Sequence, residues 1–166
     1  MSTQFSKRHR VSDRPLSDFQ EILPTPPLPE TLAEAAIGCL LTADAVEKAR
    51  LTREMAAAWR CGAIAEIGDM PVPDRPGRPD RPRLLPPGQV PKRKITRGTQ
   101  GRTALLHALA HIELNAVDLA WDLAVRFPDA GMPRDFQSDW VQVADDEARH
   151  FLMLEGRLNA LGARYG

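Results

Sequence analysis

The sequence from Thr31 to about residue 65 carries the apolar pattern of helices. No segment of the sequence shows the alternation of a strand. Thr31 suits a helix N-cap, and Glu34 stands at the capping-box position three residues later. Helix-forming residues continue from there to about residue 65. A second capping signal at Thr42-Ala43-Asp44 predicts a break near Leu41, so we expect two helices here instead of one long helix.

The two strongest helical patterns cover residues 103–127 and 134–161, and Gly162 provides the stop of the second. The residues between them, Phe127 to Pro133, include two prolines, an aspartate and a glycine, which is typical of a turn. We therefore expect an all-α fold in which residues 102–166 form an antiparallel helical hairpin.

The rest of the chain divides by composition. Residues 1–29 read as a flexible tail, residues 30–68 as an N-terminal helical segment, and residues 69–101 as a connection rich in proline and arginine. Eight prolines in this connection argue against a helix or a central strand. We expect it to lie across the helices as a strap, held by its apolar residues Leu84, Leu85, Val90 and Ile95.

Net charge adds little, since 22 basic residues balance 22 acidic ones. The basic residues gather in 71–102 and the acidic ones in 103–166, so we expect the connection to cover acidic helices of its own chain. A nucleic-acid partner is not favoured. Cys39 and Cys61 suggest no disulfide framework, and no apolar run approaches the roughly 18 residues of a membrane span. The default expectation is a cytoplasmic protein.

Two ionisable side chains lie where apolar ones are expected on the last helix. Counting about 100° per residue from Glu147, Trp140 and Leu158 fall near 20° and Val143 near 320°. His150 falls at about 300°, inside the same apolar stripe. Glu147 and His150 therefore point toward the interior of the predicted hairpin.

Glu113 has a similar position on the preceding helix. The apolar residues within about 60° of it are Leu106, Leu109, Ala110, Val117 and Ala120. Residue 130, at the centre of the turn, is the midpoint between 113 and 147, so an antiparallel hairpin brings both glutamates to one level. Because burying a bare carboxylate is prohibitive, we expect Glu113, Glu147 and His150 to share a cation. The alternative is a structural ion-pair cluster with Arg149 or Arg157.

Three further residues are candidates for a supporting role behind these ligands. His107 and His111 have the spacing of two zinc ligands, but they lie away from Glu113. We interpret them as boundary histidines, hydrogen-bonded to the first helix or to the strap. Asp146 could orient the ring of His150, although an ordinary surface aspartate is an equal alternative. No catalytic acid, base or nucleophile is evident.

The segments His107–Asp122 and Asp139–His150, the second of which ends in Glu-Ala-Arg-His, resemble a bacterial ferritin-like family known only as domain of unknown function 455. The Pro-Gly-Arg-Pro stretch and the Leu-Thr-Ala-Asp helix also fit, so the resemblance covers nearly all of residues 28–166. More distantly, the chain is similar to the bacterial tRNA hydroxylase of ferritin-like fold, which uses a di-iron centre.

The resemblance implies an incomplete ferritin-like four-helix bundle, in which Glu113 is a single-glutamate ligand and Glu147 with His150 forms the first Glu-x-x-His pair. The sequence ends at Gly166, where family members continue into a second helix pair, so we expect half of a di-iron site. Manganese is the alternative metal. A homodimer would complete the bundle, and an uncovered apolar face would favour self-association. The implied function is an oxygen-dependent oxidase or hydroxylase of unknown substrate, and the alternative is a non-enzymatic iron-binding or structural helical module.

Overall fold

The computed structural model describes residues 27–90 and 98–166, and this part of the chain is helical without a strand. Two N-terminal helices, α1 (Leu32–Leu41) and α2 (Ala45–Arg60), precede two long ones, α3 (Thr99–Val125) and α4 (Arg134–Ala160). The short 3₁₀ turns η2 (Pro87–Gln89) and η3 (Pro128–Ala130) lie before and after α3. The all-α class is confirmed, whereas most of the predicted tail lies outside the described residues.

Side-chain caps mark the starts of α1 and α2. The Thr31 hydroxyl accepts a hydrogen bond from the Glu34 amide at 3.2 Å, and the Asp44 carboxylate accepts one from the Glu47 amide at 2.8 Å. The expectation of two helices is confirmed. The end predicted near residue 65 was wrong, because Gly62 adopts a left-handed conformation with φ 79° just after α2 ends.

The boundaries of α3 also differ from the predicted 103–127. The helix begins at Thr99 and ends at Val125. Its first four residues, Thr-Gln-Gly-Arg, contain no large apolar side chain, so they give no periodic signal. Apolar periodicity finds the part of a helix that packs and misses a solvated first turn.

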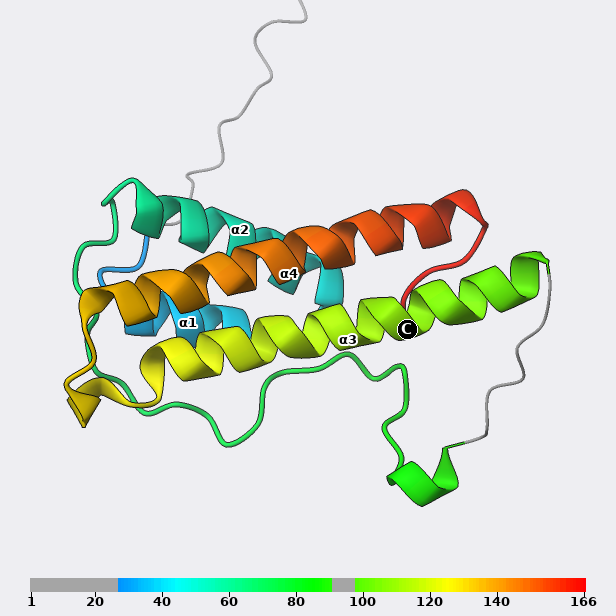
Figure 1. The fold of residues 1–166 in the computed structure, drawn as a ribbon, viewed down its shortest axis with the longest axis horizontal. Coiled ribbons are helices and arrows are strands. Elements are labelled where there is room, and N and C mark those ends of the chain that lie inside the picture. Colours follow the sequence, from blue (N-terminus) through cyan, green and yellow to red (C-terminus); the bar gives the residue numbers. More distant parts are fainter. Residues whose placement is uncertain (1–26, 91–97) are drawn as a thin grey trace, which may run out of the picture.

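The α3–α4 hairpin is the centre of the fold, with α1 packed mainly against α3 and α2 against α4. Both N-terminal helices lie behind the hairpin in Figure 1. Many of the buried residues at these contacts are alanines, which allow helices to approach closely: Ala36, Ala49, Ala56, Ala110, Ala120, Ala144 and Ala148. The indole N–H of Trp121 donates to the hydroxyl of Thr52 at 3.0 Å inside this core. Among the described residues, α1 and α2 cover one face of the hairpin, and no element covers the opposite face.

Residues 69–90, which we call the strap, run beside α3 and then leave it before η2 (Figure 1). Three of the predicted apolar anchors were wrong, since Leu84, Leu85 and Val90 are exposed. The fourth, Ile95, lies outside the described residues. The three exposed side chains come after the segment has turned away from α3. The strap is held earlier in its course: Val72 packs against the hydrophobic core, and the buried ammonium of Lys48 donates to the Gly77 carbonyl at 2.8 Å.

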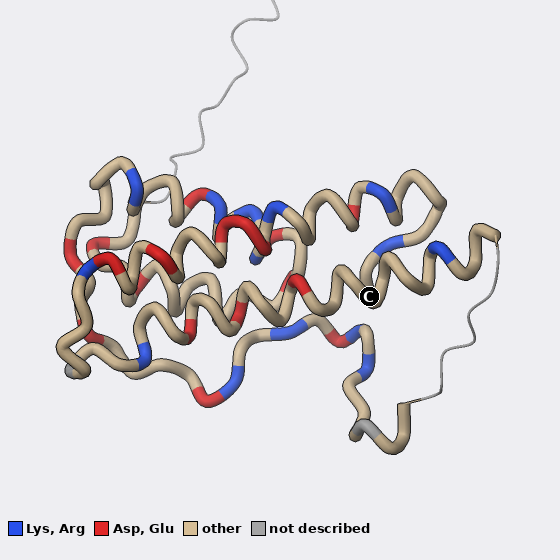
Figure 2. The backbone as a smooth tube through the Cα atoms, viewed as in Figure 1, with Lys and Arg blue, Asp and Glu red and all other residues tan. Residues whose placement is uncertain are grey.

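Charges on the strap and on α3 meet as expected from the composition. The Arg78 guanidinium lies 3.2 Å from the Asp118 carboxylate and donates to the Asn115 amide oxygen at 2.6 Å. Figure 2 shows basic positions of the strap running beside acidic positions of α3. Each helix in the described part of the chain is too short or too polar to span a lipid bilayer.

Candidate metal site

Glu113 of α3 meets Glu147 and His150 of α4 at the middle of the hairpin. One oxygen or nitrogen atom from each of the three side chains lies within 4.8 Å of the other two. His150 Nδ1 is 3.2 Å from Glu147 Oε2 and 3.7 Å from Glu113 Oε2. The turn at residues 127–133 brings the two helices into the register that their sequence spacing indicates.

The three side chains are less buried than the helical periodicity indicated. The exposed fractions are 22% for Glu113, 25% for Glu147 and 43% for His150. Leu109, which was expected inside with Glu113, is exposed as well. The buried face of α3 is centred on Leu114 and Trp121, which places Glu113 at its edge. The helical periodicity gave the wrong burial for Glu113 because α3 is apolar on two sides. Among the described residues, other helices pack against only one of those sides.

The two carboxylates shift each other's pKa in opposite directions. Burial, followed by the hydrogen bond and the charge of Glu147, raises the pKa of Glu113 to about 7. The hydrogen bond from Glu113 lowers the pKa of Glu147, with further support from His150. Below about pH 7 the pair is therefore one ionised and one protonated carboxyl group beside an imidazole. A cation bound between the two carboxylates could replace that proton.

The surroundings of His150 differ from the expected arrangement. The Asp146 carboxylate accepts hydrogen bonds from Gln142 at 3.0 Å and from Arg149 at 3.3 Å, and its relation to His150 is electrostatic. The hydrogen bond from Gln142, with support from Arg149, lowers the pKa of Asp146 against an opposing effect of burial. Arg149 is the residue beside the ring, 3.3 Å from Nε2, on the side away from the carboxylates.

His107 and His111 lie elsewhere on α3, against the C-terminal residues. His111 Nδ1 is 2.7 Å from the Tyr165 hydroxyl, and His107 Nε2 accepts a hydrogen bond from the Gly166 amide at 3.3 Å. Both imidazoles stack on the Tyr165 ring. The expected partners were the first helix or the strap, and these hydrogen bonds join the histidines to residues that follow α4.

A buried ionic cluster was missed in the sequence. Lys48 is 1% exposed, and its ammonium lies 2.5 Å from the carboxylate of Asp118, which also faces Arg78. Burial lowers the pKa of Lys48 and raises that of Asp118, while their mutual attraction acts in the opposite sense. Lys48 lies between Ala45 and Thr52 in the buried stripe of α2, and a lysine at such a position was the available signal.

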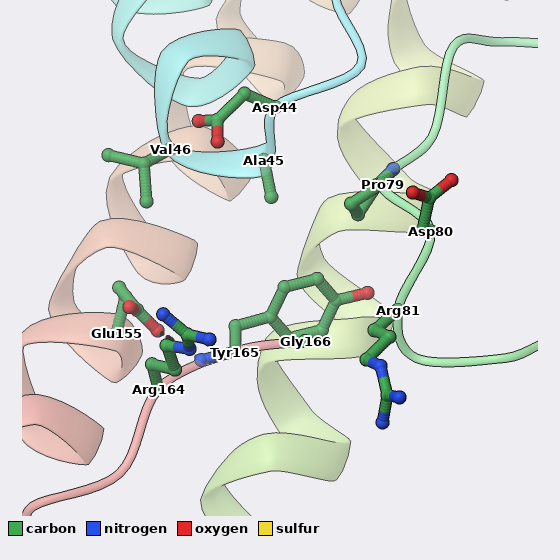
Figure 3. Close-up of a pocket in the computed structure, with 10 residues that line it drawn as sticks. All are labelled: Asp44, Ala45, Val46, Pro79, Asp80, Arg81, Glu155, Arg164, Tyr165 and Gly166. Carbon is green, nitrogen blue, oxygen red and sulfur yellow. Dashed lines mark hydrogen bonds between the residues drawn. The ribbon is translucent and has the colours of Figure 1, made fainter.

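A separate cavity of about 450 Å³ opens between the start of α2, the strap and the C-terminal residues (Figure 3). Tyr165 lies across its floor, with Arg81 on one side and the Glu155 and Arg164 side chains on the other. Its charged lining is mixed, and none of the three clustered residues takes part in it. The cavity gives no independent indication of a ligand.

Comparison with known proteins places the chain in an uncharacterised group. A family described as "Protein of unknown function (DUF455)" matches residues 41–166. An uncharacterised protein of Haemophilus influenzae is 41% identical over 93 residues, which are 53% of this chain and 32% of that protein. The chain thus spans about a third of the length of this curated relative. No solved structure matches it.

Proposed function

Since the chain belongs to the DUF455 family, whose description names no activity, we propose a function from the side chains of the hairpin themselves: ferritin-like iron binding at Glu113, Glu147 and His150. The observation that carries this proposal is the convergence of two carboxylates and one imidazole within 4.8 Å. They come from two antiparallel helices at one level, as in carboxylate-bridged helical bundles.

The donor set fits a transition metal. Ligands about 2.0–2.2 Å from one ion lie roughly 3–4 Å from each other, and the two distances from His150 Nδ1 are 3.2 and 3.7 Å. Two carboxylates neutralise a divalent charge, and an imidazole suits iron better than it suits calcium or magnesium. Manganese, which accepts the same oxygen ligands, is the alternative.

Iron bound in such a site would supply oxygen chemistry, which favours an oxidase or hydroxylase of unidentified substrate. The residues of this chain would hold the metal, with Arg149 restricting the imidazole from its other side. The second candidate is an iron-binding protein without substrate chemistry, which the moderate exposure of the three ligands favours. A third reading, a purely structural polar cluster, requires that no metal binds.

The test is ferrous iron binding under anaerobic conditions, measured by elemental analysis after desalting. We expect the wild-type chain to retain iron, and His150→Ala and Glu147→Ala to weaken binding by roughly tenfold or more. Asp139→Asn is the matched control, since Asp139 is an exposed carboxylate on the same helix. It should bind as the wild type does. Circular dichroism verifies that each variant is folded.

The outcomes separate the three readings. A wild-type chain that retains neither iron nor manganese supports the structural cluster and excludes the proposal. Iron retention with oxygen consumption that depends on an added reductant supports the enzyme. Iron retention and oxidation without sustained oxygen turnover supports the iron-binding protein.

A further inference from the structure

The exposed side of α3 carries an apolar seam with the spacing of a coiled coil. Its members follow one another at steps of four and three residues: Leu105, Leu109, Ile112, Ala116, Leu119 and Leu123. The exposed fractions are 57% for Leu105, 38% for Leu109, 60% for Ile112 and 57% for Leu119. Side chains at this period form one stripe about 27 Å long, which is the kind of surface that packs against another helix.

The matching side of α4 carries a second seam at the same steps. It contains Phe136, Trp140, Val143, Glu147, His150 and Leu154. Val143 is exposed, and the others are partly buried. Glu113 lies next to Ile112 of the first seam, whereas Glu147 and His150 belong to the second. Glu147 and His150 therefore interrupt the second seam at its centre, and Glu113 lies beside the first, on the face of the hairpin that the described residues leave uncovered.

The cluster also lies at the middle of both helices. Residue 112 is the centre of α3 (Thr99–Val125), and residue 147 is the centre of α4 (Arg134–Ala160). Consider a two-fold axis that lies in the plane of this face and crosses both helices at the level of the cluster. Rotation about this axis places α3 antiparallel to the α3 of the second copy, and α4 antiparallel to its α4, with the midpoints of each pair at the same level. The full lengths of two hairpins then overlap, and each cluster meets its own copy.

We infer that the uncovered face of α3 and α4 binds the same face of a second copy of this chain. The inference rests on the proposed function in one respect, since the partner would contribute its own Glu113, Glu147 and His150 to the site. A di-iron site in a helical bundle takes about four carboxylates and two histidines. Glu113, Glu147 and His150 are half of that set, and two copies of them related by a two-fold axis make up all of it.

The test combines sedimentation equilibrium with iron binding for the wild type and two double variants of the full chain. Leu105→Glu/Ile112→Glu places charges in the α3 seam. Leu41→Glu/Leu84→Glu is the control, because those leucines are exposed to 55% and 58%, close to the 57% and 60% of the seam pair, but lie off this face. We expect a dimer for the wild type and the control, and a monomer for the seam variant with iron affinity lower by roughly tenfold or more.

Two results would overturn the inference. One is a wild-type chain that stays monomeric at about 100 µM, with or without iron. The other is a seam variant that remains as dimeric as the control. Tight iron binding by such a monomer would leave the proposed function standing alone. Conversely, a dimer that the seam variant abolishes but that binds no iron supports the interface and removes the proposed function.

Discussion

At the scale of single residues, the raised pKa of Glu113 has a consequence for stability. The pKa of Glu113 is raised from 4.5 to about 7 in the folded chain. The folded state thus binds a proton that the unfolded state releases between those values. The stabilising contribution of Glu113 is present below pH 4.5 and is lost as the pH rises through about 7.

We therefore expect Glu113→Gln to change the pH dependence of the metal-free protein. Glutamine resembles the protonated carboxyl group at every pH, so the variant should gain stability relative to wild type by on the order of 1 kcal/mol between pH 5 and 8. Urea unfolding at several pH values measures this difference. Asp139→Asn should show the same pH dependence of the unfolding free energy as the wild type. If Glu113→Gln also shows that same pH dependence, the raised pKa of Glu113 is contradicted.

Asp118 is the second residue whose removal has a defined effect. Asp118→Leu leaves the buried ammonium of Lys48 with carbonyl partners but without its carboxylate, and we expect a loss of about 3–5 kcal/mol. The double variant Lys48→Met/Asp118→Leu should recover most of this loss, because neither charge remains buried. Equilibrium denaturation measures both. A double variant as unstable as Asp118→Leu alone would show that the loss comes from packing and not from the charge.

The sequence predicted the cluster residues more readily than the Lys48–Asp118 pair, for a physical reason. Glu113 and Glu147 lie on helices with long, regular apolar patterns, and equal distances from one turn determine their level. Lys48 and Asp118 lie on different elements whose contact depends on the side from which α2 approaches the hairpin. No local pattern encodes that approach.

At the scale of elements, the strap depends on a close approach at Gly77. The Gly77 amide donates to the Leu40 carbonyl at 2.8 Å, and a Cβ atom at this position would lie 2.3 Å from the Leu41 carbonyl oxygen. We expect Gly77→Ala to displace the strap from α1 and to cost about 1–3 kcal/mol. Thermal unfolding measures the change.

Gly38→Ala is the control for this prediction. Gly38 lies inside α1, and nothing comes within 4 Å of a Cβ added there. This substitution should stabilise the protein by about 0.5–1 kcal/mol, since alanine is the better helix former. A Gly77→Ala variant as stable as Gly38→Ala would show that the strap tolerates displacement.

Element boundaries followed the sequence where a cap marked them, as at Thr31 and Asp44. They failed where the signal depended on tertiary contacts. The leucines of the strap were expected to anchor it, but the sequence could not show that the chain turns away from α3 before reaching Leu84. The strap is held instead by backbone hydrogen bonds of Gly77, which carry no side-chain signal, and by the ion pair of Arg78, whose partner on α3 no local pattern identifies.

At the scale of the whole molecule, the hairpin and its register could be predicted, but the coverage of its faces could not. Apolar residues surround much of α3, and Leu114 and Ile112 look alike in the sequence. Only the placement of α1 and α2 decides that Leu114 is buried and Ile112 is exposed. The expected exposed apolar patch is confirmed for the described residues, and its effect on association stays a prediction.

The prolines of the strap also limit how this molecule can associate. Seven of the 22 residues from 69 to 90 are prolines, and each lacks the amide N–H that a neighbouring strand would need. The segment can therefore lie along α3 with few unsatisfied donors and without a sheet partner. It therefore offers no continuous edge for strand addition by another chain.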